Sequence, residues 1–225
     1  MEYIFIILFI LIFLIKNYSF NEGIPTCNNF VVNVYLYLSI AILLTGIFMY
    51  YIKNIGINNK LYIGSIIMSF ILIILLSLRP IYYKKGTVFN HLLWILFILS
   101  IAVLLTPISE KHIIPNLIKV SIIFMLMTLL SIYNKKLIDT YSSYIFSVLF
   151  ISLITIIVSE LLFLIFYPDK YNINIMSVIV VILFSGFIVY DTNRIYKYSD
   201  NCINKPNYPK VSLDLFLDLL NIFVR

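Results

Sequence analysis

Apolar residues occur along this chain in long blocks that short polar segments separate. A membrane-spanning helix needs about 20 mostly apolar residues. Six blocks approach or reach this length, at residues 31–52, 61–78, 92–106, 113–133, 144–167 and 173–190. A seventh block, residues 212–224, is too short to cross a bilayer alone. The pattern predicts an all-α membrane protein: a seven-helix transmembrane bundle with a short last helix.

An extra apolar segment precedes these blocks, at residues 3–15. It is short for a span and no basic stretch comes before it, so a signal-like segment, a short extra span and an interfacial helix all remain open. No small-residue cleavage pattern follows, which favours retention. The expected organisation is an N-terminal segment and linker, residues 1–29, followed by one membrane domain, residues 30–225.

Composition supports the membrane class and indicates which kinds of partner to expect. Hydrophobic residues make up 62% of the chain and charged residues 12%, about half the charge of a typical soluble domain. The alternation of an outer-membrane barrel strand is absent. The net charge of +6 comes from basic residues in short loops. In such loops, basic residues indicate which side of the membrane the loop faces. We therefore expect the lipid bilayer as a partner and no nucleic acid.

The distribution of basic residues orients the bundle, because cytosolic loops are enriched in Lys and Arg. The loops after the second, fourth and sixth blocks carry nine basic residues, and the opposite side carries four, or five with Lys119. We expect the richer side, and the segment before residue 31, to face the cytosol. The nine are Arg79, Lys84, Lys85, Lys135, Lys136, Arg194, Lys197, Lys205 and Lys210.

Cysteine and histidine suggest no metal site. Cys27 and Cys202 are far apart in sequence and show no metal-ligand spacing. We predict that both are free thiols. His91 and His112 lie near the ends of apolar blocks, without Cys, Asp or Glu at ligand spacing. We expect no cofactor.

The most unusual residue is Asp191, which ends the apolar run of residues 178–190. A carboxylate at the centre of a membrane helix costs about 2.5–3.5 kcal/mol on insertion scales, and less toward the ends. Such residues often mark an ion path or a proton switch. Alternatively, Asp191 pairs with Arg194 at i+3 at the end of a helix. Gly186, five residues earlier, would let another helix approach closely.

The last apolar block carries a second acid. On a helix, polar residues follow at spacings of four, three and four and fall on one face; they are Asp214, Asp218, Asn221 and Arg225. This stripe either faces the bundle interior or lies solvated on a helix that is flat at the membrane interface. Spacing alone favours neither.

Glu160 lies deep in the block of residues 144–167. In a bilayer it should face the protein interior, either protonated or paired with a cation or a polar group. It is an accessory candidate for the same polar interior.

The chain lacks the motifs of common enzyme classes. The chain has no nucleophile–base arrangement, phosphate loop or zinc-protease motif, so we predict no catalytic residues. Intramembrane aspartyl proteases combine Tyr-Asp with Gly-x-Gly-Asp on neighbouring helices. Tyr190-Asp191 matches the first, and the second is missing. We expect a protein that is not an enzyme.

Two segments resemble a known family. Gly186-Phe-Ile-Val-Tyr-Asp-Thr-Asn193 resembles the signature of the transmembrane Bax inhibitor motif family, which includes the Bax inhibitor-1 and lifeguard proteins, and Phe216-Leu-Asp-Leu-Leu-Asn-Ile-Phe223 resembles its closing segment. Residues 183–192 look most similar to the Golgi anti-apoptotic protein branch, which includes viral members. The resemblance covers roughly residues 30–225. The N-terminal segment and the basic, Pro-rich linker 204–210 depart from it.

The resemblance implies a seven-helix bundle with the last helix near its centre. It implies a pH-sensitive pair of aspartates, carried over onto Asp191 and Asp218. Two carboxylates that share a proton titrate as a pair. A basic residue near the end of the second span latches one of them, a role that falls on Lys84 or, alternatively, Arg79.

The resemblance also implies the function. It predicts a multi-pass inhibitor of apoptosis in the Golgi or the endoplasmic reticulum, which modulates calcium leak from intracellular stores, with calcium as the permeant ion. The alternative is a non-conducting membrane protein that binds host calcium channels or death regulators. The sequence does not predict an oligomeric state.

Overall fold

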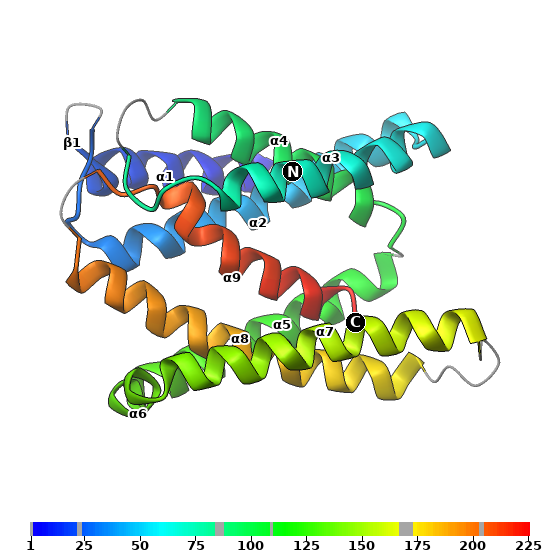
Figure 1. The fold of residues 1–225 in the computed structure, drawn as a ribbon. Helices are drawn as coiled ribbons and strands as arrows, with labels where there is room; N and C mark the ends of the chain where they lie inside the picture. Colours follow the sequence, from blue (N-terminus) through cyan, green and yellow to red (C-terminus); the bar gives the residue numbers. More distant parts are fainter. Residues whose placement is uncertain (1, 22–23, 84–87, 109, 167–172, 203–204) are drawn as a thin grey trace. The chain divides into compact units, whose positions relative to one another are not determined.

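The chain is almost entirely helical, as the apolar blocks predicted. The computed structural model describes residues 2–21, 24–83, 88–108, 110–166, 173–202 and 205–225. Within them lie nine helices and one pair of short strands (Figure 1). In chain order these are α1 Glu2–Ser19, β1 Phe20–Asn21, β2 Ile24–Pro25, α2 Phe30–Ile55, α3 Asn59–Ser77, α4 Val88–Leu105, α5 Glu110–Tyr133, α6 Lys135–Thr140, α7 Ser142–Phe166, α8 Ile173–Asp200 and α9 Tyr208–Phe223.

Six of the helices are long and apolar enough to cross a membrane: α2, α3, α4, α5, α7 and α8. These are the six predicted blocks, which confirms the all-α membrane class. The predicted segment 3–15 lies in α1, whose apolar part, Phe5–Asn17, is shorter than a span. Most of its described side chains are exposed.

Local sequence signals set the turn between α2 and α3. Gly56 has a positive φ of 83° at the end of α2, where glycine avoids the penalty that a Cβ would bring. Asn58 then caps α3, because its side chain accepts a hydrogen bond from the Leu61 amide at 2.7 Å.

Two compact units make up the described structure. The first contains residues 1–109 and 197–216, and the second contains residues 110–196 and 217–225. α8 and α9 each contribute residues to both units. In the first unit, α4 packs against α2 and α3, and α1 packs against α2 and β1.

An aromatic cluster forms the core of the first unit at the start of α9. Tyr208 is 1% exposed. Its ring stacks on Tyr37, 5.5 Å between centroids, and is tilted against Phe30. Tyr37 also contacts the Trp94 ring edge-on, and its hydroxyl is 2.8 Å from Nε2 of His91. Residues from α2, α4 and α9 are thus held together near one end of α2.

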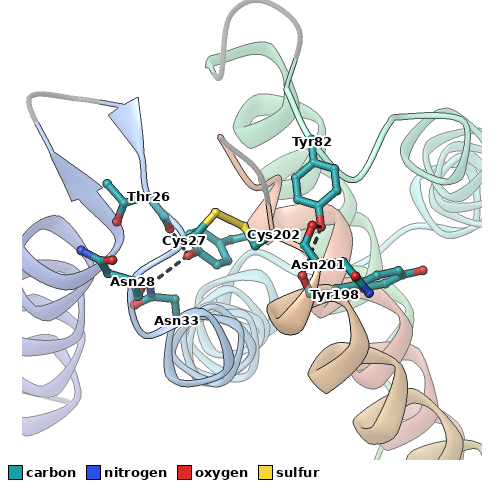
Figure 2. The surroundings of a disulfide bond; sticks show 9 residues. Thr26, Cys27, Asn28, Asn33, Tyr82, Tyr198, Asn201 and Cys202 are labelled. Atoms are coloured by element: carbon teal, nitrogen blue, oxygen red, sulfur yellow. Dashed lines mark hydrogen bonds between the residues drawn. A yellow bond between two sulfur atoms is a disulfide. The ribbon is translucent and has the colours of Figure 1, made fainter. Parts of the chain in front are cut away.

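The two cysteines are bonded to each other, so the prediction of free thiols is wrong. The sulfur atoms of Cys27 and Cys202 are 2.05 Å apart. Figure 2 shows the bond between the segment before α2 and the loop after α8. A separation of 175 residues in sequence carries no pairing signal; only the fold brings these segments together.

The loop between α3 and α4 is bound to the linker between α8 and α9. The Tyr83 amide donates to the Lys205 carbonyl at 2.8 Å, and the Asn207 amide donates to the Ile81 carbonyl at 2.7 Å. The side chain of Asn207 adds a hydrogen bond to the Pro80 carbonyl at 3.0 Å. The basic, Pro-rich linker is therefore an ordered part of the first unit where it is described.

We expect Tyr208→Phe to destabilise the first unit. The Tyr208 hydroxyl donates to the Thr26 carbonyl and accepts from Nδ2 of Asn33 at 3.0 Å. Losing both bonds should cost about 1–3 kcal/mol, measured by thermal unfolding in detergent. Tyr141→Phe, at a 56% exposed tyrosine, is the matched control. Equal losses for the two variants would contradict this assignment.

The same tyrosine gives a pH dependence. Burial raises the pKa of Tyr208 from 10.0 to about 12, although the hydrogen bond from Asn33 opposes the rise. Between pH 10 and 12 the unfolded tyrosine loses its proton while the folded one keeps it, so stability falls as pH rises. Tyr208→Phe should lose stability less steeply across that interval; a slope unchanged from wild type would refute the effect.

Candidate functional site

The second unit brings both motif aspartates into buried positions. Asp191 on α8 is 8% exposed and Asp218 on α9 is 5% exposed. Asp191 does not end its helix, because α8 continues to Asp200. The prediction of a helix end at this point is wrong: the apolar run stops, but the polar residues that follow keep packing, and Ile195 is 3% exposed.

Arg194 contacts Asp191 within α8. Its Nη1 lies 3.8 Å from Oδ1 of Asp191, and the Arg194 side chain is 38% exposed. The i,i+3 ion pair between Asp191 and Arg194, which the sequence allowed as one of two alternatives, is therefore present. Its separation is at the outer limit for a salt bridge and its cation is partly exposed, so it contributes little stability.

α9 is a buried helix. Leu215, Phe216, Leu219 and Ile222 are at most 6% exposed, which rules out a helix lying flat at the interface with solvated acids. Along the predicted polar stripe, Asp218 is buried and Asp214 and Asn221 are half-buried. The Asn221 amide donates to the Leu217 carbonyl of its own helix at 2.8 Å.

Asp139 is a site residue that the sequence did not reveal. It lies on α6, and its Oδ1 accepts a hydrogen bond of 2.9 Å from Nδ2 of Asn193, within the signature segment. Lys135, also on α6, lies over the Tyr196 ring, 5.5 Å from Nζ to its centroid. In the sequence, Asp139 is one acid in a short, mostly basic loop. This pattern is too common to identify a site residue. α6 thus contacts α8 just beyond Asp191.

Gly186 allows the close approach that the sequence predicted. A Cβ added there would lie 2.8 Å from Cδ2 of Leu149 on α7. One turn further along α8, the Tyr190 ring lies 5.4 Å from the Phe146 ring, between centroids. The absent side chain lets α7 pack closely against α8 just before Asp191.

Gly186→Leu should therefore destabilise the second unit. Leu149 can move aside for one methyl group but not for a leucine, and overpacking of this kind costs about 1–3 kcal/mol. Gly64→Leu is the control, because a Cβ at Gly64 on α3 meets nothing within 4 Å. Thermal unfolding in detergent should separate the two variants; a comparable loss in both would argue against close packing at Gly186.

Glu160 is paired with a cation. Its Oε1 lies 2.9 Å from Nη2 of Arg225, and its Oε2 accepts a hydrogen bond of 3.1 Å from the same nitrogen. Of the two alternatives for this intramembrane acid, pairing is the one observed. Arg225 lies just beyond the end of α9 at Phe223, so the last residue of the predicted stripe is outside the helix, and the ion pair links α7 to the segment that follows α9.

A cavity of about 460 Å³ lies near the same end of α9. Asn116, Lys119, Ser177 and Arg225 provide its polar groups, and Ile and Val side chains line the rest. Asn116 also donates to the Phe223 carbonyl at 3.0 Å. The described lining includes neither motif aspartate.

Of the two latch candidates, Lys84 lies outside the described residues. Arg79 belongs to the first unit, where its guanidinium lies over the Phe89 ring, 4.7 Å from the centroid. The loop that follows Arg79 is hydrogen-bonded to the linker before α9 at Tyr83 and Ile81. The latch role itself stays a prediction.

The comparisons with known proteins agree with the resemblance seen in the motifs. The family model described as "Inhibitor of apoptosis-promoting Bax1" matches residues 27–225. The chain belongs to this Bax inhibitor family. The match includes both motif aspartates and α2 to α9. It begins after α1.

Two relatives of this Bax inhibitor family protein come from Arabidopsis thaliana. Protein LIFEGUARD 2 is 28% identical over 210 residues, which is 87% of this chain and 84% of the relative. Protein LIFEGUARD 3 is 28% identical over 179 residues, 75% of this chain and 66% of the relative. The chain thus spans just under two thirds of LIFEGUARD 3. The likeness to the Golgi branch stays a prediction.

Proposed function

We propose that this Bax inhibitor family protein suppresses cell death by modulating calcium leak from intracellular stores, with Asp191 and Asp218 as a proton-sensitive pair. The supporting observation is the burial of both motif acids in the second unit. A carboxylate in a membrane-spanning helix is costly and usually functional. Asp191 lies in such a helix and Asp218 is buried on α9. Two buried acids, each within one of the two family motifs, are best explained by a shared function.

The proposed mechanism depends on charge. When both carboxylates are ionised, they repel each other and attract a cation, either calcium or the latch residue at Lys84 or Arg79. Protonation removes both effects. Asp139 acts as a positioning residue in this scheme, because its hydrogen bond to Asn193 holds the turn of α8 that follows Asp191. The expected location is the Golgi or the endoplasmic reticulum.

A second candidate function is a non-conducting protein that binds calcium channels or death regulators. The ion pairs Asp191–Arg194 and Glu160–Arg225 favour it, because paired acids attract a permeant cation less strongly. The calcium-leak function requires the two motif aspartates, whereas the non-conducting function does not.

The Asp191→Asn/Asp218→Asn double variant tests the proposal in cells. Both store calcium and survival after an apoptotic stimulus should return to the values of cells that lack the protein. Normal expression and membrane insertion of the double variant are the control. Full protection by the double variant, with unchanged store calcium, would overturn the proposal in favour of the non-conducting function.

A further inference from the structure

The chain contains two cysteines, and the Cys27–Cys202 bond uses both. The Cα atoms are 5.9 Å apart, within the normal range for a disulfide. Both residues belong to the first unit and lie outside helices and strands. An intramolecular disulfide in this chain can therefore form only between these two residues.

The position of the bond conflicts with a permanently oxidised state. Cys202 lies in the loop after α8, between Lys197 and Lys205, on the side that the basic residues assign to the cytosol. Cys27 precedes α2, and the described residues between the two cysteines include six candidate spans, an even number, which assigns Cys27 to the same predicted side. The cytosol keeps thiols reduced. On that assignment, the bond would form only when the cytosol becomes oxidising.

Both cysteines lie at partly exposed positions, where a small thiol can approach. Each residue is partly exposed, and Figure 2 shows the bond between two non-helical segments. Thiol–disulfide exchange requires a thiolate to reach a sulfur atom along the S–S axis, and access governs its rate. A bond of this accessibility can be opened and closed without unfolding.

Non-covalent contacts hold each of the two segments in place independently of the sulfur atoms. Next to Cys27, the Thr26 carbonyl accepts from the Tyr208 hydroxyl, and the Asn28 carbonyl accepts from Nδ2 of Asn33 at 2.8 Å. Next to Cys202, the Tyr82 hydroxyl donates to the carbonyls of Tyr198 and Asn201, at 3.1 and 3.3 Å. These contacts keep the reduced thiols close enough to pair again.

We propose that Cys27 and Cys202 form a reversible redox-modification site, with a glutathione-type disulfide as the oxidant. One thiolate attacks the oxidant and forms a mixed disulfide, which releases one glutathione. The second thiolate attacks the protein sulfur of that bond and displaces the other glutathione. Two protein thiols are oxidised to one disulfide, and the oxidant is reduced to two thiols that take up the two protons.

Oxidation restrains the linker between α8 and α9. In the reduced protein the linker keeps its hydrogen bonds to the loop between α3 and α4, at Tyr83 and Ile81. In the oxidised protein it is also joined covalently to the segment before α2. The Asn207 amide should therefore exchange with solvent more slowly in the oxidised form.

Thiol counting on the full chain in intact cells tests this site. Thiols are trapped with a maleimide–polyethylene glycol before and after exposure to a thiol oxidant. We expect two labels per chain before exposure, none after it, and two again after recovery. No label before exposure would show a permanent cross-link, and two labels after it would show an inert dithiol; either overturns the proposal.

Reconstitution in glutathione buffers gives a second readout. The wild-type protein should exchange hydrogen more slowly at the Asn207 amide in the oxidised buffer than in the reduced one. Cys27→Ser/Cys202→Ser should exchange at the reduced rate in both buffers. Equal rates for the wild type in both buffers would refute the linker restraint. Neither readout involves calcium, so its outcome is independent of the proposed leak.

Discussion

Asp218→Asn should lower calcium flux through the protein in proteoliposomes by about tenfold and flatten its dependence on pH. The amide has nearly the same shape as the carboxylate but carries no titrating proton, so packing around Leu215 and Leu219 is preserved while the charge is lost. A change of about 1.4 kcal/mol in cation attraction corresponds to a tenfold change in occupancy. Initial rates of calcium uptake across a pH series measure the effect.

Asp200→Asn is the matched control. It removes the same charge at the exposed end of α8 and should leave both the rate and its pH dependence unchanged. Flux through the Asp218→Asn protein at the wild-type rate, with the wild-type pH dependence, would show that this acid does not control conduction.

Arg225→Gln should destabilise the second unit. It leaves the Glu160 carboxylate in a membrane-spanning helix without the guanidinium that lies 2.9 Å away. Removing one partner of a buried pair costs about 3–5 kcal/mol. Because the two side chains are 25% and 19% exposed, we expect about 1–3 kcal/mol, measured by thermal unfolding in detergent.

The Glu160→Gln/Arg225→Gln double variant isolates the pair. Two amides can hydrogen-bond in place of the ion pair and carry no charge into the membrane, so the double variant should recover more than half of the loss. If the loss of stability in the double variant equals the sum of the losses in the two single variants, the contact contributes no coupling energy.

The membrane class and the spans could be predicted because a bilayer imposes a simple rule on sequence. Each crossing needs about 20 apolar residues, and the blocks at 31–52 and 113–133 meet it unambiguously. The close packing at Gly186 was also predictable, because a glycine inside a span lets another helix approach closely. The two aspartates could be identified because charge inside an apolar run is rare.

Other features depend on tertiary contacts that leave no local pattern. The end of α8 was misplaced by ten residues because the end of the apolar run, at Tyr190, was taken as the end of the helix. α6 has only six residues, so neither it nor Asp139 could be distinguished from a loop. The Cys27–Cys202 bond joins residues that only the fold brings together.

The central claim is that Asp191 and Asp218 titrate as a pair, and carboxyl infrared titration of the reconstituted protein with isotope-labelled aspartate tests it most directly. Coupled acids lose their protons in two steps that belong to the pair. Replacing Asp191 with Asn should therefore leave Asp218 titrating in a single step, with its midpoint displaced by about one pH unit or more. A midpoint for Asp218 that is the same with and without Asp191 would contradict the account.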